Sequence, residues 1–398
     1  MPHDPPRYDF DEIIDRRGTN ASKWDGMAER YGDVPEDAIP MWVADMDFRP
    51  PEAVNQALRE MVAHGVYGYP ANYDALNDAV AAWMRERHGW EVDPNHIFST
   101  HGLTNAIGLC LAAFTEPGDG IVVFSPVYHA FGRVVRAAGR ALVECPLTAD
   151  PDGRYRFDFE AYQAQMTGRE RMILLCSPHN PGGRVWSREE LEGVVEFARR
   201  NDLILVSDEV HHDLVYDGGP RHVPTGCIDG VQDRLITLTA ATKTFNLAGV
   251  HLGQVTIADP ALRSRFAAQY KALSVSAGAI PPVMIRAAYS RDGAEWLAQL
   301  LAYLDGNRAL FDAGVAAIPG VRSMPLEATY LAWVDFSALG MDDEEITRRV
   351  FQEARIVVNL GPTFGTGGAG FLRFNFATPR ARVQEAVDRL QAAFADVQ

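Results

Sequence analysis

Three stretches of this sequence place a polar residue shortly after an apolar, strand-like run. The runs and the polar residues that follow them are 172–176 before Asn180, 203–206 before Asp208, and 235–239 before Lys243. Ligands of an open parallel sheet bind beyond the carboxyl ends of its strands. The amine, the carboxylate and the amide could therefore surround one crevice.

Taken alone, a lysine at the end of a strand most often extends its amine to solvent. Lys243 has small neighbours and a buried run before it, and desolvation there would lower its pKa and make it nucleophilic. An amine, a carboxylate and an amide are the set that pyridoxal 5'-phosphate needs. Lys243 would bond the cofactor covalently, Asp208 would keep its ring nitrogen protonated, and Asn180 would donate to its ring oxygen.

The order of these motifs resembles the class I/II aminotransferase superfamily, which is fold type I of the pyridoxal phosphate enzymes. The motifs are Asn-Pro-x-Gly from Asn180, Asp-Glu from Asp208, and Thr-Lys-Thr-Phe-Asn-x-Ala-Gly around Lys243. More narrowly, the chain resembles the PatB/MalY-like C–S lyases of the cystathionine β-lyase type, from residues 40–48 to Arg373. The resemblance implies an α/β fold with a large, mostly parallel-sheet domain at residues 51–285. It also implies a smaller α+β domain from residues 1–50 plus 286–398.

A strand at residues 97–100, a glycine and a buried helix after it form a possible phosphate site. Free N–H groups and the positive end of the helix dipole would face the anion there. One glycine at such a turn is a weak signal by itself, and the family order strengthens it. We assign Gly102, Leu103 and Thr104 to the phosphate, the first two through backbone amides.

The resemblance implies further cofactor contacts. Tyr128, after a buried strand that Pro126 ends, would stack on the pyridine ring, and Thr242 would bind the phosphate. A tyrosine of the loop after residue 64 would reach the phosphate of a partner subunit in a homodimer with shared active sites. The sequence does not choose between Tyr67 and Tyr69 for that contact.

Two histidines depart from the general aminotransferase pattern. His211 stands where many aminotransferases have a tyrosine that donates to the ring oxygen, and His251 stands where a phosphate-binding arginine is frequent. The first change agrees with the C–S lyase subgroup. The second leaves more of the phosphate charge to Thr242 and to the helix N-terminus.

Arg373 lies in an otherwise apolar strand-like run and must find an anion, because an unpaired buried guanidinium is costly. A structural Asp or Glu would satisfy it, and so would the α-carboxylate of a substrate, held as a bidentate fork. The family order favours the substrate. Trp42, in the segment that lines the substrate entrance of the family, is a second candidate for substrate binding.

Composition limits the partners. The 398 residues carry a formal net charge of −16, which disfavours nucleic acid and anionic membranes as partners. No apolar run approaches the length of a membrane span, and residues 1–6 contain no apolar signal segment. The four cysteines lack metal-binding spacing, so we expect no metal and a reducing, cytoplasmic location.

The expected reaction is β-elimination from a small amino-acid thioether such as cystathionine, giving a thiol, pyruvate and ammonia. An aminotransferase shares the steps up to loss of the α-proton and is the nearest rival. A regulatory protein that contacts a transcription activator is another, since that role is known in the family. Among other elements, the periodicity predicts helices at residues 51–64 and 261–273 and a long helical stretch near residues 282–310 that crosses between the domains.

Overall fold

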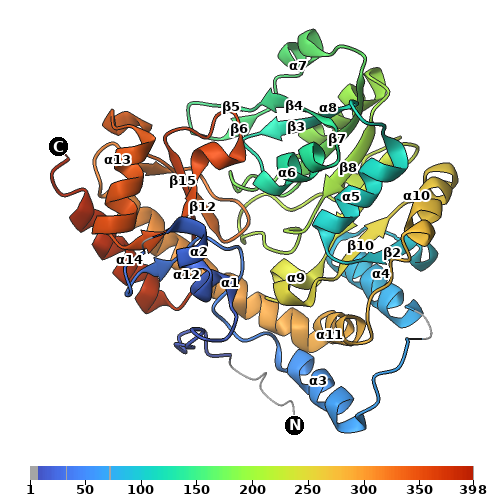
Figure 1. Ribbon diagram of the computed structural model, residues 1–398, viewed down its shortest axis with the longest axis horizontal. Helices are drawn as coiled ribbons and strands as arrows, with labels where there is room; N and C mark the ends of the chain where they lie inside the picture. The colour runs from blue at the N-terminus through green and yellow to red at the C-terminus, as the bar shows by residue number, and fades with distance from the viewer. Residues whose placement is uncertain (1–7, 33, 71–72, 398) are drawn as a thin grey trace.

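The computed structural model describes residues 8–32, 34–70 and 73–397, so the N-terminal residues predicted to hold no signal segment lie outside it. Its centre is a seven-stranded sheet in the order β2-β10-β9-β8-β7-β3-β4 (Figure 1). The strands are β2 (Ile97–Thr100), β3 (Gly120–Ser125), β4 (Ala141–Pro146), β7 (Glu170–Cys176), β8 (Ile204–Asp208), β9 (Leu235–Thr239) and β10 (Gly253–Thr256).

Strands β4, β3, β7, β8 and β9 run parallel, and β10 is antiparallel to both β9 and β2. The sheet is therefore mostly parallel, as predicted. The register pairs Cys176 with Asp208 and Asp208 with Leu238. Because β7, β8 and β9 are neighbours that end at the same level, the residues after them meet at one edge of the sheet.

Helices cover both faces of this sheet. Ile121 and Val123 of β3 pack in a core with α5 (Leu103–Phe114), α6 (His129–Ala137) and α10 (Pro260–Ala272). Val122 and Phe124, which alternate with them, pack in a second core with α7 (Phe159–Gln165) and α8 (Arg188–Arg200). Burial on both faces explains why these strands read as continuous apolar runs.

A four-stranded antiparallel sheet of the order β11-β12-β15-β14 forms the C-terminal part of the molecule. Its strands are β11 (Arg322–Ser323), β12 (Leu331–Asp335), β14 (Asn359–Leu360) and β15 (Phe371–Asn375), with α13 (Asp343–Arg348) and α14 (Arg380–Ala393) beside them. The N-terminal arm joins this part, because β1 (Ile39–Pro40) pairs in parallel with β13 (Ile356–Val357). The arm also holds two short helices, α1 (Ser22–Asp25) and α2 (Met27–Tyr31).

The helical stretch predicted near residues 282–310 is present, but it consists of two helices, α11 (Ile280–Ala288) and α12 (Arg291–Ala316). Ser290 between them is extended, with φ −132° and ψ 173°, and its side chain accepts the Gly293 N–H to begin α12. A side chain at Gly293 would collide with the Ala288 carbonyl, at 1.8 Å from a Cβ, so this glycine lets the two helix ends approach closely. Helix α12 then runs to the C-terminal part of the molecule, as Figure 1 shows.

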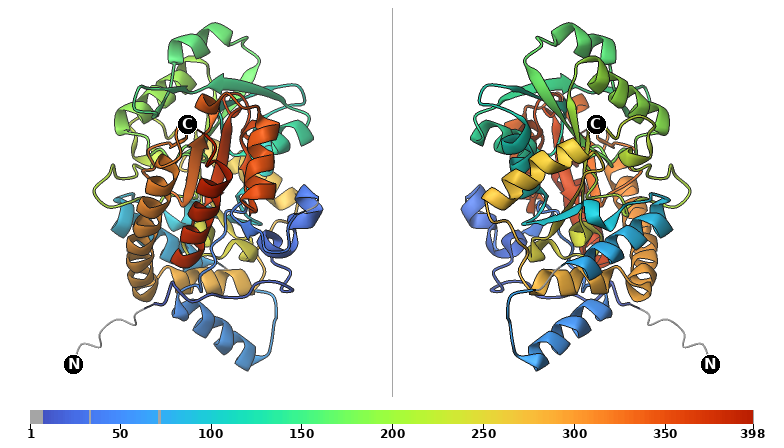
Figure 2. Two further views of the ribbon diagram at one scale, coloured as in Figure 1. Left: turned by 90° about the vertical axis from the view of Figure 1, so that its left-hand side faces the viewer. Right: turned by 90° about the vertical axis from the view of Figure 1, so that its right-hand side faces the viewer.

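Helix α3 (Glu52–His64) lies at the lower edge of the molecule, and the segment after it leads away to α4 (Asp74–His88) (Figure 2). Helices α3 and α10 match the predictions at residues 51–64 and 261–273 to within one residue at each end. Among the described residues, no helix combines the length and the apolar character that a membrane span requires.

Candidate active site

A cavity of about 420 Å³ lies at the carboxyl ends of β7, β8 and β9. Most of the predicted cofactor residues line it, and they come from segments far apart in the sequence. They are Gly102, Leu103, Thr104, Tyr128, Asn180, Asp208, His211, Thr242 and Lys243, joined by Ala44, His101, Arg133, Cys176, Val210, Ala248 and His251.

Lys243 lies in the four-residue helix α9 (Ala241–Thr244), which follows β9 directly. Its amine donates to the carbonyl of Ala44 at 2.6 Å, and the hydroxyl of Tyr330 donates to the same carbonyl at 3.0 Å. Burial lowers the pKa of Lys243 from 10.5 to about 8. A neutral, nucleophilic amine is therefore accessible near neutral pH.

Asp208 is the last residue of β8 and faces the same cavity. Its Oδ1 accepts the N–H of Val210 at 3.1 Å. Burial raises the pKa of this carboxyl from 3.8 to about 7, although the Val210 N–H and the charge of Lys243 oppose the rise. A buried carboxyl with few hydrogen-bond donors is stabilised in its ionised form by a cationic N–H donor, which a protonated pyridine ring supplies.

The N-terminus of α5 opens onto the cavity and can bind an anion. Leu103 and Thr104 begin the helix, so their N–H groups have no partner within it. The Gly102 N–H donates to the Thr100 carbonyl at 2.8 Å, so the contact of this amide with the phosphate stays a prediction. Gly102 provides the turn, with φ 80°, that starts the helix at this point. His251 lines the cavity beside it.

Two buried side chains leave polar atoms facing the cavity without a protein partner. His211 is 2% exposed, and its Nδ1 makes no hydrogen bond in the part of the chain that the structure describes. Burial and the charge of Lys243 hold its pKa well below 6.5, so the ring is neutral. Asn180 accepts a hydrogen bond from Arg373 through Oδ1 at 2.9 Å, which leaves its Nδ2 as a donor. A ligand with a ring oxygen fits these groups.

Arg373, in β15, lies behind Asn180 and is 2% exposed. Its guanidinium donates to Asn180 Oδ1, to the Trp42 carbonyl at 2.9 Å and to Asn359 Oδ1 at 2.5 Å, all neutral acceptors. Within the described chain no carboxylate forms an ion pair with it, and its Nε has no partner. The structural Asp or Glu that the sequence left open is therefore not there. A buried, unneutralised guanidinium attracts an anionic ligand, and burial lowers its pKa to about 10.

The other predicted residues lie outside the cavity lining in this chain. Trp42 gives Arg373 its carbonyl, while its indole donates to the Lys23 carbonyl at 2.9 Å and its ring packs on Tyr31. Tyr67 and Tyr69 are 57% and 104% exposed in the segment after α3. Their predicted roles in substrate and partner contact stay predictions.

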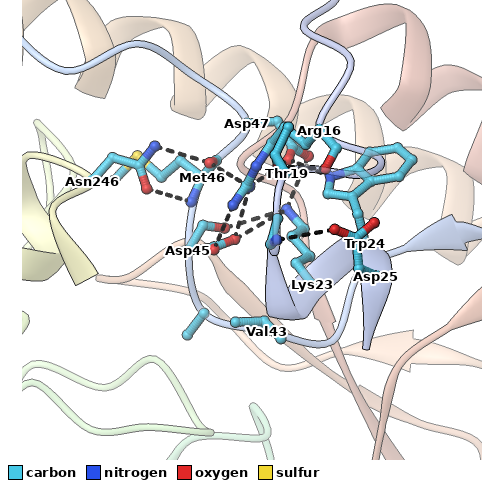
Figure 3. A network of polar contacts seen from close by, with 12 residues as sticks. Arg16, Thr19, Lys23, Trp24, Asp25, Val43, Asp45, Met46, Asp47 and Asn246 are labelled. Atoms are coloured by element: carbon cyan, nitrogen blue, oxygen red, sulfur yellow. Dashed lines mark hydrogen bonds and ion pairs between the residues drawn. The ribbon is translucent and has the colours of Figure 1, made fainter. Parts of the chain in front are cut away.

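The segment that carries Ala44 is fixed by a buried polar network (Figure 3). Asp47 is 2% exposed and accepts from Lys23 at 2.9 Å, from Arg16 at 2.8 Å and from the indole of Trp24 at 3.0 Å. Arg16 also pairs with Asp45 at 2.9 Å. Burial alone would raise the pKa of Asp47, but its cationic and N–H partners hold the pKa at about 2. The network connects α1 and the chain before it to the Ala44–Asp47 segment, which contacts Lys243 through the Ala44 carbonyl.

Sequence reasoning did not assign several cavity residues, among them Ala44 and Arg133. Ala44 acts through its backbone carbonyl, so its side chain gave no signal. Arg133 lies on α6 five residues after Tyr128, which is not an i+3 or i+4 helical spacing, so the pattern did not single it out.

Comparison with known proteins agrees with this geometry. Residues 36–390 match the family described as aminotransferase class I and II. The chain belongs to this family. It is 39% identical to cystathionine beta-lyase PatB of Bacillus subtilis (strain 168) over 388 residues, covering 96% of this chain and 99% of that protein. Protein MalY of Escherichia coli (strain K12) is 29% identical, with coverage of 96% and 97%.

Among solved structures, cystalysin from Treponema denticola, which contains pyridoxal 5'-phosphate, superposes with a TM-score of 0.93. It is 33% identical and covers 98% of this chain and 100% of that one. The predicted family and fold class are confirmed. The cavity of this class I and II aminotransferase family member also fits the cofactor. It offers an amine for the aldehyde, a carboxyl for the ring nitrogen, donors for the ring oxygen and a helix N-terminus for the phosphate.

Proposed function

We propose that this protein is a pyridoxal phosphate-dependent C–S β-lyase that cleaves cystathionine or a related S-substituted cysteine to a thiol, pyruvate and ammonia. The observation that carries the proposal is the placement of Lys243 and Asp208 on one cavity, with the unneutralised Arg373 hydrogen-bonded to Asn180, which lines the same cavity. The similarity along nearly the whole chain to a cystathionine β-lyase selects the reaction type among those that this set can support.

When bound, pyridoxal phosphate withdraws electrons from the α-carbon of the substrate. Lys243 would hold the cofactor through its amine, and the same amine, once free, would remove the α-proton of the substrate. Asp208 keeps the ring nitrogen protonated, which maintains the electron withdrawal. Asn180 and His211 would contact the ring oxygen, and the amides of Leu103 and Thr104 would hold the phosphate.

Arg373 and Asn180 orient the substrate. The guanidinium has an unpaired Nε, and a carboxylate that approached it would neutralise a buried charge. Holding the α-carboxylate there fixes which bond of the α-carbon points toward Lys243. Arg49, which could have offered a second carboxylate site at the entrance, instead pairs with Glu12 at 2.6 Å on the surface.

The products distinguish a lyase from an aminotransferase. Holoenzyme incubated with cystathionine alone should release thiol and pyruvate in equal amounts over many turnovers. S-methylcysteine should do the same, because a thiolate leaves readily from the β-carbon. A single half-turnover that stalls until a keto acid is added would show that the protein is an aminotransferase.

We propose that the protein works as a homodimer with shared active sites. Exposed apolar side chains support a dimer. They lie on α3, on the segment after it and at the ends of α10 and α11, and they are Val62, Val66, Tyr67, Tyr69, Leu273 and Ile280. Large apolar side chains gathered on one exposed face often mark an interface between protein chains. A partner that covered these side chains could bring Tyr67 or Tyr69 to the neighbouring phosphate.

Subunit mixing tests the sharing. A Tyr67→Phe/Tyr69→Phe double variant and a Lys243→Ala variant should each be weakly active or inactive. A mixed dimer should regain one intact site, built from Lys243 of one chain and the tyrosines of the other. Mixtures that show only the sum of the two separate activities would exclude shared sites. We also place the enzyme in the cytoplasm, which the four free cysteine thiols support.

A further inference from the structure

A cluster of histidines and carboxylates lies on the opposite side of the active-site backbone. His88, at the end of α4, places Nε2 at 2.8 Å from Oδ1 of Asp213. His212 places Nε2 at 3.2 Å from Oδ2 of the same carboxylate. All three residues are buried or nearly so, and their ligand-type atoms lie within 4.8 Å of one another.

The hydrogen bond on the other nitrogen of His212 fixes its tautomer. Nδ1 lies 2.5 Å from the carbonyl of Glu209, and a carbonyl can only accept, so Nδ1 carries the proton. In the neutral ring, Nε2 then directs a lone pair at the Asp213 carboxylate. This nitrogen is buried and makes no hydrogen bond among the described residues. A lone pair that faces a carboxylate oxygen at 3.2 Å is repelled by it, so either a proton on Nε2 or a metal cation lies between the two.

We propose that His88 Nε2, His212 Nε2 and a carboxylate oxygen of Asp213 bind a divalent transition-metal ion of the zinc type. Two imidazoles and one carboxylate suit such ions and leave open positions for water. Histidine ligands of metals usually donate their second N–H to a carbonyl or a carboxylate, as His212 does. Asp213 is oriented in the same manner by the Trp83 indole at 3.1 Å and the Thr244 hydroxyl at 3.0 Å.

The ion has a route of entry and requires small movements. A groove of about 760 Å³ between the end of α4 and the 212–222 segment is lined by all three ligands. Zinc–nitrogen bonds of about 2.0 Å would draw the two imidazoles closer together. Arg87, whose Nε lies 3.1 Å from Asp213, would turn outward, which its 31% exposed side chain permits. His222 stays with Glu209, at 3.0 Å from Oε2.

The position explains what binding would do. His212 follows His211, Glu209 follows Asp208, and Thr244 follows Lys243 along the chain. The ion would therefore connect α4, through His88, to the end of β8 and the segment after it, which carry Asp208 and His211, and it would lie outside the cofactor cavity. Its effect is on stability and on the rigidity of the site, and the chemistry does not pass through it.

The test uses holoenzyme freed of metal by a chelator and titrated with zinc chloride in a calorimeter. Wild type should bind one zinc per chain and melt at a higher temperature with zinc present. His88→Gln and His212→Gln should each bind it about 100-fold more weakly or worse. His64→Gln, at an exposed position on α3, is the matched control and should bind like wild type.

Retained cofactor absorbance and circular dichroism show that the variants are folded. If either variant fails to fold, zinc-edge anomalous scattering from soaked wild-type crystals locates the ion, and a peak between His88 and His212 supports the site. No zinc binding by wild type would mean that a proton alone separates His212 from Asp213. Unchanged affinity in both folded variants, or a zinc peak elsewhere, would equally overturn the proposal.

Discussion

The side chain of Asn246 forms hydrogen bonds with both the N–H and the carbonyl of Met46. Its Oδ1 accepts the Met46 N–H at 2.8 Å, and its Nδ2 donates to the Met46 carbonyl at 2.9 Å and to the Phe48 carbonyl at 2.7 Å. Asn246 lies three residues after Lys243, and Met46 lies two after Ala44. The Asn246 side chain therefore connects the segment that carries Lys243 to the Ala44–Met46 segment, whose Ala44 carbonyl accepts the lysine amine.

Replacing Asn246 should disturb the lysine without removing the cofactor. Asn246→Ala leaves buried backbone groups unpaired and should lower the free energy of unfolding by about 3 kcal/mol. Misplacing the Ala44 carbonyl should also lower kcat by about 10-fold to 100-fold. Thermal melts and steady-state kinetics measure the two effects, and the cofactor absorbance should persist.

Asn246→Gly is the matched control for backbone strain. The residue has φ 56°, which alanine tolerates poorly and glycine accepts. The glycine variant should therefore recover part of the stability of the alanine variant, while kcat stays low. Full activity in the glycine variant would show that the hydrogen bonds to Met46 do not position the lysine.

Lys243→Ala should lower turnover by at least about 1000-fold, because it removes both the covalent anchor and the base. The chain contains only three lysines, Lys23, Lys243 and Lys271, so the anchor is readily mapped. Borohydride reduction of wild type followed by peptide mass spectrometry should place the cofactor on Lys243. Lys271→Ala, on α10, should leave both label and rate unchanged. Label on another lysine would contradict the assignment.

The sequence predicted the part of the site that depends on local pattern. Apolar runs that end in Asn180, Asp208 and Lys243 belong to adjacent parallel strands, so their side chains converge by topology alone. The buried Arg373 was recognisable for the same reason, since a charge in an apolar strand must be explained.

What the sequence did not reveal depends on backbone atoms and long-range contacts. Ala44 reaches Lys243 through a carbonyl, across 199 positions of sequence. The hydrogen bond from the Gly102 amide to the Thr100 carbonyl, a local backbone contact, gave no signal in the sequence. The break between α11 and α12 occurs at the extended Ser290, and Gly293 permits the close approach of the two helix ends.

The cofactor should enter the apoprotein with a pH dependence set by two groups. Lys243 has a lowered pKa of about 8, so its nucleophilic neutral form increases as the pH rises through 8. Asp208 has a raised pKa of about 7, so it is protonated below pH 7 and ionised above it. Both changes favour cofactor binding at the higher pH. The rate of reconstitution, followed by absorbance, should therefore rise from pH 6 to about 8.5 and then level off.

Asp208→Asn separates the two contributions to this profile. It should remove the component near pH 7, keep the component near pH 8, and weaken cofactor binding by loss of a charge-assisted hydrogen bond. A rate that continued to rise to pH 10.5, the ordinary pKa of a lysine, would show that burial does not lower the pKa of Lys243.

Arg373→Lys keeps a positive charge but loses the planar fork, and it should lower kcat/KM by about 100-fold. The loss should lie mainly in KM if the arginine holds the α-carboxylate equally in the ground and transition states. Cofactor affinity should change little, because Arg373 lies outside the cavity lining. A variant with unchanged KM and kcat would refute the carboxylate role.

Arg133 should set the preference for the leaving group. It lines the cavity from α6, and no carboxylate of the described chain forms an ion pair with it. Cystathionine carries a second carboxylate on the thiol that leaves, whereas S-methylcysteine carries none. Arg133→Gln should therefore lower kcat/KM for cystathionine about 10-fold or more, with little change for S-methylcysteine. Arg136→Gln, three residues later on the same helix, is the control, because Arg136 lies outside this cavity and near Glu144 at 3.9 Å. Equal losses for both substrates would show that Arg133 acts on the cofactor or on the fold, and the distal carboxylate would then need another partner.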